Sequence, residues 1–126
     1  MRFDPASTHI LVGGVLEGPL GVTRFVRFVI DPGTPHTVVD TPLMDALGFH
    51  AGIAVGRSTL WGVSGVTEGY VVRAPRIRVV GKELRDYRVA VHDFAEGLGV
   101  EALLGLDFFR GGYLGLDFVT GEITAR

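Results

Sequence analysis

Apolar residues along this chain come in short runs, which glycine-rich or proline-rich turns separate. Within several runs apolar positions alternate with polar ones, which is typical of strands with one buried face. Gly13 and Gly14 predict a bulge or bend in the first strand. The pattern predicts an all-β, barrel-like fold. Its strands are expected over residues 9–16, 22–30 and 37–40, in a hairpin over 57–73, in a separate strand pair of 76–80 with 87–91, and in a terminal hairpin over 113–124.

Helix signals gather at one place, after the third predicted strand. Thr41 suits the N-cap, Pro42 suits the first helical position, and Gly48 suits the end. The apolar residues between them form one face of the predicted helix. Later in the chain, Asp107 is suited to cap a single helical turn. The sequence therefore predicts one short helix within a β fold.

Composition limits the classes of protein that fit. A length of 126 residues predicts a single domain over residues 1–126, and the 19 glycines, about twice the usual share, agree with many tight turns. The net charge of −2 gives no general attraction to nucleic acid or to an anionic membrane. The absence of Cys excludes disulfides and thiolate chemistry. No targeting segment or membrane span is visible, so we expect a soluble, cytoplasmic protein.

An acidic residue, Asp31, stands where a nearly all-apolar strand ends. Gly33 allows a close approach of the backbone, and the hydroxyl of Thr34 lies within reach of the carboxylate. An aspartate in this setting is suited to catalysis. It is also suited to accepting hydrogen bonds from turn amides, which is the more common role of an isolated Asp-x-Gly. The loop alone leaves both interpretations open.

Two further segments have features of a site. The predicted hairpin over 58–72 has a glycine-rich tip and carries Trp61 in mid-strand, as a mobile cover over a site does. An ordinary surface hairpin has the same features. The run Leu103-Leu104-Gly105, taken alone, is explained by core packing, and Asp107 after it is explained as a helix cap.

Other catalytic patterns are missing. The four histidines lack metal-ligand spacing, so we expect no metal and no cofactor, and we interpret the histidines as surface or turn residues. Neither Ser58 nor Ser64 stands in a Gly-x-Ser-x-Gly context, which argues against a serine hydrolase. The arginines at 73–88 are interleaved with Glu83 and Asp86, which indicates a solvated sheet face and not a nucleic-acid patch.

The order of these segments resembles the retropepsin-like aspartic proteases, especially the small bacterial ones. Residues 28–39 look like the family's catalytic loop and following strand, and the helix of 41–48 also follows there. The segment 61–70 lies where the family has its flap, and 102–109 resembles its late apolar-apolar-Gly motif. Together the four segments make the resemblance specific, and it covers residues 9–124.

The resemblance implies a retropepsin-like acid-protease barrel with one short helix and a flap hairpin. It assigns catalysis to Asp31, with Leu104 and Gly105 as supporting residues. The rest of the active-site loop would be Pro32, Gly33 and Thr34. The flap and its substrate-binding residues would be Leu60, Trp61, Gly62, Val63, Ser64, Gly65 and Val66.

The chemistry of this family requires two carboxylates that share one proton, because like charges so close cannot both ionise. The ionised member activates a water, and the protonated member polarises the scissile carbonyl. The sequence contains one loop of the right kind, since neither Asp107 nor Asp117 is followed by glycine two residues on. The resemblance therefore implies a homodimer that contributes Asp31 from each subunit and cleaves a peptide or protein substrate.

Pro32 departs from the family pattern, which has Thr or Ser at this position. That hydroxyl and its backbone N–H bond to the opposite loop in the family, and proline has neither donor. Thr34 keeps a hydroxyl that could bond to the outer oxygen of Asp31. Three functions therefore remain open: an aspartic endopeptidase, a catalytically weak or inactive dimerisation or peptide-binding module, and an unrelated small β-barrel that binds a ligand.

Overall fold

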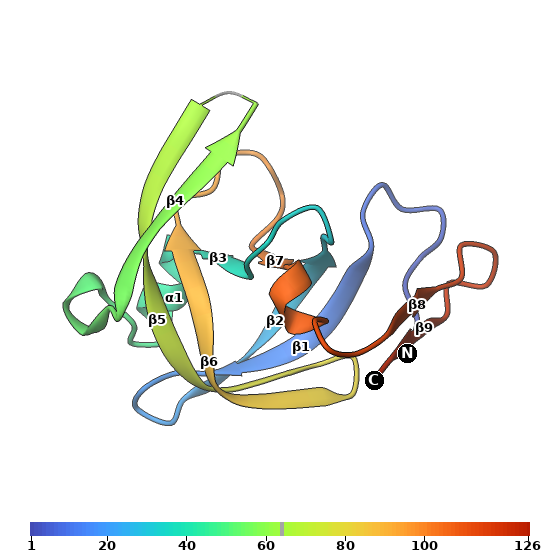
Figure 1. The fold of residues 1–126 in the computed structure, drawn as a ribbon, viewed down its shortest axis with the longest axis horizontal. Helices are drawn as coiled ribbons and strands as arrows, with labels where there is room; N and C mark the ends of the chain where they lie inside the picture. Colours follow the sequence, from blue (N-terminus) through green and yellow to red (C-terminus); the bar gives the residue numbers. More distant parts are fainter. Residues whose placement is uncertain (64) are drawn as a thin grey trace.

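The protein folds into a closed β-barrel with one projecting hairpin (Figure 1). The computed structural model describes residues 1–63 and 65–126, and within these ranges six strands close the barrel. The predicted all-β barrel with one short helix is confirmed. The strands are β1 Leu11–Glu17, β2 Thr23–Ile30, β3 Val38–Asp40, β4 Gly56–Gly62, β5 Gly65–Val79, β6 Lys82–His92, β7 Ala102–Leu104, β8 Leu114–Leu116 and β9 Ile123–Ala125. The helical segments are α1 Thr41–Ala46 and the 3₁₀ turns η1 Ala51–Ile53 and η2 Leu106–Phe108.

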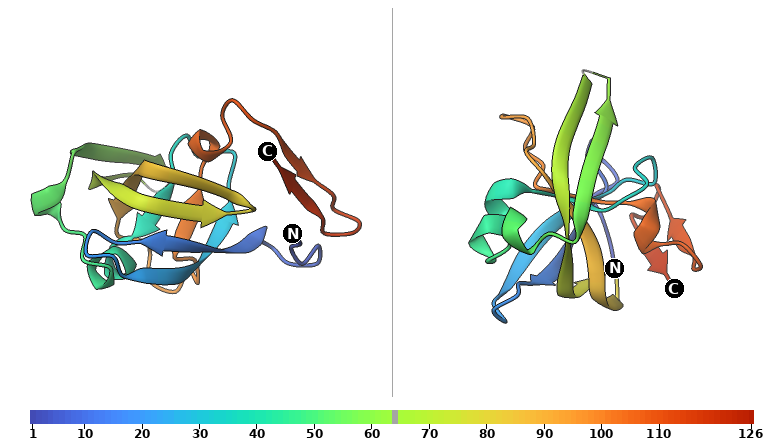
Figure 2. Two further views of the ribbon diagram at one scale, coloured as in Figure 1. Left: turned by 90° about the horizontal axis from the view of Figure 1, so that it is seen from below. Right: turned by 60° about the vertical axis from the view of Figure 1, so that its left-hand side comes forward.

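The barrel closes because β1 pairs with a strand on each of its edges. The order around the barrel is β1-β2-β7-β3-β6-β5, and β5 then pairs with β1. Two of the pairings, β2 with β7 and β3 with β6, are parallel. Closure removes the free edges that an open sheet presents. The strand β4 pairs with β5 outside this ring, so the β4–β5 hairpin rises from the barrel (Figure 2).

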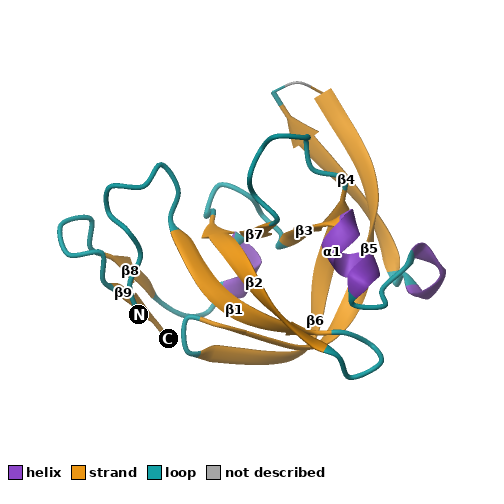
Figure 3. Cartoon of the chain, turned by 180° about the vertical axis from the view of Figure 1, so that it is seen from behind, coloured by secondary structure: helices purple, strands orange, loops and turns teal. Residues whose placement is uncertain are grey.

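Large apolar side chains fill the barrel. Leu16, Phe28 and Ile77 are fully buried and come from β1, β2 and β5. The short helix α1 adds Leu43 and Met44 to the same core. The helical segments are small beside the strands, as Figure 3 shows. In the described residues no helix is long and apolar enough to cross a membrane.

Gly13 and Gly14 do not form the predicted bulge, because β1 pairs with β2 in one unbroken register along its length. Their role is close packing. A Cβ on Gly14 would lie 2.8 Å from the carbonyl oxygen of Arg78 and 2.7 Å from a methyl of Val79, both in β5. Glycine at position 14 therefore allows β1 and β5 to meet where the barrel closes.

The strand β5 runs through 15 residues, although the sequence predicts two strands here. It pairs in succession with β4, β6 and β1. The alternation of buried positions changes phase at Pro75, which lies between buried Ala74 and buried Ile77. This change of phase makes one continuous strand look like two in the sequence.

The helix α1 is capped differently from the prediction. Thr41 is its first residue, Asp40 is the N-cap, and Asp40 makes no capping hydrogen bond through its side chain. Its carboxylate accepts a bond from the backbone N–H of Phe94 instead, at 2.9 Å. The predicted proline at the helix start and glycine after its end are confirmed, since Gly48 has φ of 94°. The Asp40 side chain therefore bonds to the distant Phe94 and not to the first turn of the helix.

The predicted terminal hairpin is present as a small separate sheet of β8 and β9. The N-terminal residues join it, because Arg2 pairs with Glu122 and the N–H of Phe3 donates to the carbonyl of Gly121 at 2.8 Å. Both chain ends therefore lie at this sheet, away from the β4–β5 hairpin (Figure 1).

Replacing Gly14 by Ala should lower the free energy of unfolding by about 1–3 kcal/mol, because the new Cβ meets backbone of the closing strand. Gly13→Ala is the matched control. Its Cβ would meet the ring of Phe25, which is exposed and can rotate away, so a change within about 0.5 kcal/mol is expected. Urea unfolding of the three proteins measures both values. Equal destabilisation by the two substitutions would contradict this role of Gly14.

Candidate active site

The Asp31 loop begins where β2 ends and is ordered by its own backbone. The N–H of Asp31 donates to the carbonyl of Leu104 at 3.0 Å, which continues the parallel pairing of β2 with β7. The Asp31 carboxylate accepts a hydrogen bond from the N–H of Gly33 at 3.0 Å, and the backbone carbonyl of Asp31 accepts one from the N–H of Thr34 at 3.1 Å. One carboxylate oxygen is therefore held by the turn, and Pro32 and Gly33 stand exposed at the tip.

The predicted supporting residues, Leu104 at the end of β7 and Gly105 after it, belong to a segment that lies directly against this loop. The N–H of Leu106 donates to the carbonyl of Thr34 at 2.8 Å, and that of Asp107 donates to the carbonyl of Pro35 at 3.2 Å. A Cβ on Gly105 would collide with the backbone of His36. Glycine at position 105 therefore lets two backbones pack together, which the apolar-apolar-Gly pattern alone does not explain.

The buried hydroxyl of Thr37 joins three parts of the chain. It donates to the carboxylate of Asp107 at 2.9 Å, and it accepts from the backbone N–H of Gly105 at 3.2 Å. The hydroxyl of Tyr87 in β6 lies 3.1 Å away. Because the single proton of Thr37 is committed to Asp107, Tyr87 is the donor in this pair. Burial is the main cause that raises the pKa of Tyr87 far above its usual value, and the nearby charge of Asp107 raises it further, so the phenol keeps this proton.

This cluster changes the predicted role of Asp107. The N-cap of η2 is Gly105, and Asp107 lies inside the turn with its carboxylate on Thr37. The sequence pattern predicts a strand at Thr37 and gives neither Thr37 nor Tyr87 a role in the site. No local signal marks them, since Thr37 lies 50 residues from Tyr87 and 70 from Asp107.

The second predicted part of the site, the β4–β5 hairpin, lies across a groove from the Asp31 loop. The groove encloses about 520 Å³. Asp31, Gly33 and Thr34 line one side, while Pro32 is exposed at the loop tip and is not part of the lining. The predicted hairpin residues that line the other side are Leu60, Trp61, Gly62, Gly65 and Val66.

The hairpin tip is apolar and exposed. Trp61 is 80% exposed and Val66 is 46% exposed, although both line the groove. Val63 at the tip is fully exposed and is not part of the lining. Ser64, the remaining predicted member, lies outside the described residues. The groove is therefore bounded by apolar surface that faces solvent in this structure.

One interpretation of the histidines is wrong, because His92 is buried in β6. Its Nε2 lies 2.8 Å from the hydroxyl of Ser58 in β4, and its Nδ1 lies 3.4 Å from the hydroxyl of Thr67 in β5. The imidazole thus connects both strands of the hairpin to the barrel. Burial lowers the pKa of His92, and the charges of Glu68 and Asp93 oppose this effect.

Thr34 is also placed differently from the expectation. Its hydroxyl donates to the carbonyl of His36 at 3.4 Å, and not to Asp31. The side chain is buried beneath the loop. Thr34 therefore stabilises the loop from below and leaves the outer oxygen of Asp31 facing the groove without this donor.

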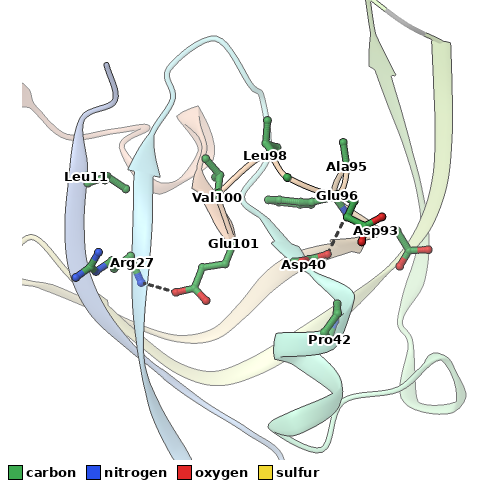
Figure 4. A pocket seen from close by; sticks show the side chains of 13 residues that line it. Leu11, Arg27, Asp40, Pro42, Asp93, Ala95, Glu96, Leu98, Val100 and Glu101 are labelled. Carbon is green, nitrogen blue, oxygen red and sulfur yellow. Dashed lines mark hydrogen bonds between the residues drawn. The ribbon is translucent and has the colours of Figure 1, made fainter. Parts of the chain in front are cut away.

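The loop between β6 and β7 forms a wall of the groove and is anchored at both ends. The N–H of Phe94 donates to Asp40, and a carboxylate oxygen of Glu101 accepts from the backbone N–H of Arg27 at 3.2 Å (Figure 4). Behind this loop is a hollow of about 610 Å³ that four acidic residues help to line. They are Asp40, Asp93, Glu96 and Glu101. The described residues form no group of three or more side chains suited to hold a metal ion.

Comparison with known proteins identifies the family. The family model described as "Aspartyl protease" matches residues 12–108, which include the Asp31 loop, the hairpin and the segment after β7. The chain belongs to the aspartyl protease family. The family predicted from the sequence motifs is therefore confirmed. No curated protein matches the chain.

Solved structures place this aspartyl protease among the retropepsin-like folds. A retropepsin-like aspartic protease from Rickettsia conorii is similar over 100% of this chain and 95% of its own, with a TM-score of 0.68 and 16% identity. The retroviral protease-like domain of Ddi1 from Leishmania major is similar over 94% and 88%, with a TM-score of 0.64 and 15% identity. At these identities the likeness shows the fold.

Replacing Thr37 by Val should destabilise the protein by about 2–4 kcal/mol. Valine keeps the shape but leaves the N–H of Gly105 and the carboxylate of Asp107 without their partner. Thr37→Ser, which keeps the hydroxyl, is the control and should cost about 1 kcal/mol for the lost methyl group. Urea unfolding measures both. If valine is no worse than serine, the hydroxyl does not hold the loop.

Stability should fall as the pH drops below about 6.5, the ordinary pKa of histidine. Because the pKa of His92 is lowered in the folded state, the unfolded chain takes up a proton first and gains stability relative to the fold. Above that pH the contribution of His92 is constant. His92→Gln, compared with the exposed His9→Gln as control, should flatten this part of the curve of unfolding free energy against pH. An unchanged slope would exclude His92 as its source.

Proposed function

We propose that this aspartyl protease is a homodimeric endopeptidase in which Asp31 of each subunit forms the catalytic pair. The observation that carries the proposal is the position of Asp31 on the floor of a groove that the apolar β4–β5 hairpin covers from the other side. Family membership supports the same chemistry. If Asp31 only accepted hydrogen bonds from the amides of its turn, it would not need to face a groove of this kind.

The reaction is hydrolysis of a peptide bond by an activated water. One Asp31 carboxylate is ionised and takes a proton from the water, which attacks the carbonyl carbon. The protonated Asp31 of the partner subunit donates its proton to the carbonyl oxygen, and a tetrahedral intermediate forms. When the intermediate collapses, the C–N bond breaks and the carboxyl that took the water proton gives a proton to the leaving nitrogen. The other carboxylate takes a proton from a hydroxyl of the intermediate, so the pair again holds one proton.

Three features support the dimer. The chain carries one Asp-x-Gly loop, so the second carboxylate requires a second copy. The loop tip, Pro32 and Gly33, is exposed and available to a partner. The β8–β9 sheet has two strands, and such a pair is marginally stable by itself. Around it Phe118 is 62% exposed and Val119 is 89% exposed, which is apolar surface suited to contact another subunit.

The substrate would lie extended in the groove between the Asp31 loop and the hairpin. The hairpin presents Leu60, Trp61 and Val66 as apolar surface for side chains of the peptide. An extended peptide can also use backbone hydrogen bonds, as it does when it adds a strand to a sheet. We propose that the hairpin acts as a flap that opens to admit substrate.

Pro32 supports the second candidate, a module that binds peptides or dimerises with weak or no catalysis. A proline at the loop tip has no N–H or hydroxyl to bond across to a partner loop. Each missing bond is worth about 1 kcal/mol. The two candidates share the dimer and the groove, and they differ in whether the paired carboxylates come close enough to share a proton.

The Asp31→Asn variant should lose about 10²–10⁴-fold in cleavage rate while keeping its fold, because an amide cannot accept the proton from water. The measurement is cleavage of unfolded casein by the native and variant proteins, with circular dichroism as the check on folding. Asp45→Asn, an exposed carboxylate on α1, is the matched control and should cleave at the native rate.

Sedimentation equilibrium of the same proteins tests the dimer. A native protein that dimerises without cleaving would support the binding module. A strictly monomeric native protein, or an Asp31→Asn variant that cleaves at the native rate, would overturn the proposed enzyme.

A further inference from the structure

A second hollow lies next to the groove, on the sheet formed by β4, β5 and β6. It encloses about 750 Å³. It is continuous with the groove, because His36, Ser58, Thr59 and Ala90 line both. The catalytic proposal makes no use of it.

Arginines dominate the lining of this hollow. Arg57 comes from β4, Arg73 from β5, and Arg85 and Arg88 from β6, and all four are exposed. The acids of the lining are Asp86 and Asp107. Since Asp107 already accepts the bond from Thr37, its charge is partly engaged elsewhere. A positive site has thus formed on a chain whose net charge is −2.

The arrangement of two arginines is unfavourable without an anion. Arg73 and Arg88 are direct partners across β5 and β6, and like charges in this position repel. Arg85 forms an ion pair with Glu83. In the described part of the chain, no carboxylate lies within ion-pair distance of Arg57, Arg73 or Arg88. Three guanidinium groups are therefore free to bind an added anion.

Apolar side chains accompany the charges. Val71 and Leu84 line the hollow beside the arginines and are partly buried. This combination suits an acidic side chain of a peptide, whose methylene groups pack on apolar surface while its carboxylate meets the fork of a guanidinium group. A small free anion would use the charges alone.

We propose that this arginine hollow binds an acidic residue of the peptide substrate, away from the bond that is cleaved. The inference rests on the proposed function, because it places an extended peptide in the adjoining groove. Along β4, Trp61 lines the groove and Arg57 lines the hollow, four residues and about 13 Å apart at the rise of a strand. The acidic residue is therefore expected several residues along the peptide from the one that lies beneath Trp61.

Peptide binding to the Asp31→Asn protein tests the inference without cleavage. One fluorescent peptide is neutral and apolar, and its relatives carry a single Glu at successive positions, with a Gln series as the isosteric control. Fluorescence anisotropy gives each affinity. At one position Glu should bind about three to ten times more tightly than Gln at low salt, and the ratio should fall as salt is added.

The variants Arg73→Gln and Arg88→Gln, each combined with Asp31→Asn, should reduce the Glu-to-Gln ratio to about one. Arg78→Gln removes an exposed arginine of β5 that does not line the hollow, and it should leave the ratio unchanged. Both hollow variants should unfold at the same or a higher urea concentration, because they relieve the repulsion between Arg73 and Arg88. Should either fail to fold, Arg88→Lys keeps the charge and should reduce the ratio by losing the guanidinium fork.

The outcomes separate this inference from the proposed function. Equal binding of the Glu and Gln peptides would overturn the arginine hollow as a specificity site and leave the peptidase proposal standing. Failure of every peptide to bind would overturn both. If inorganic phosphate raises the melting temperature through Arg73 and Arg88 while Glu has no advantage over Gln, the hollow is a free-anion site and the peptide assignment is wrong.

Discussion

The hydroxyl of Thr37 is the contact on which the geometry of the site depends. It connects the segment that follows Asp31 to Tyr87 in β6 and to Gly105 and Asp107 beyond β7. The hydroxyl is fully buried, so water cannot replace any partner that is lost. Because backbone bonds from Leu106 and Asp107 hold the same loop, the position of the Asp31 carboxylate depends on this frame as well as on its own short turn.

Close backbone packing is the second requirement of this frame. Gly105 allows η2 to approach the backbone at His36, and Gly14 allows β1 to approach β5 where the barrel closes. In both places a single methyl group would meet backbone atoms, which cannot move aside as a side chain can. The close packing of backbones therefore explains these two glycines, while other glycines serve turns such as the one at Gly48, with φ of 94°.

The hairpin differs from the barrel in how it is held. In the described residues it pairs with the rest of the sheet only through the continuation of β5, and His92 connects its two strands to β6 by polar contacts. The surface along the groove is also uneven in charge. The hollow behind the β6–β7 loop carries four acidic residues, and the hollow beside β4 carries four arginines.

The amino-acid sequence was enough to predict most of the strands, the single helix, the position of Asp31 after β2 and the glycine-rich hairpin, because alternation, turn residues and capping residues act over a few neighbours. It also determined the family, since the motifs keep their order along the chain. The three-dimensional fold was needed to show that residues 102–104 form the strand β7 and that β5 is continuous. It was also needed to show the burial of His92, the cluster around Thr37 and the gathering of the four arginines. In the Thr37 and His92 clusters the partners lie between 25 and 70 residues apart, and their contacts exist only once the barrel has closed. Asp40 and Asp107 illustrate the same point, because each is a residue type suited to a local helix cap, but its carboxylate accepts a hydrogen bond from a distant segment.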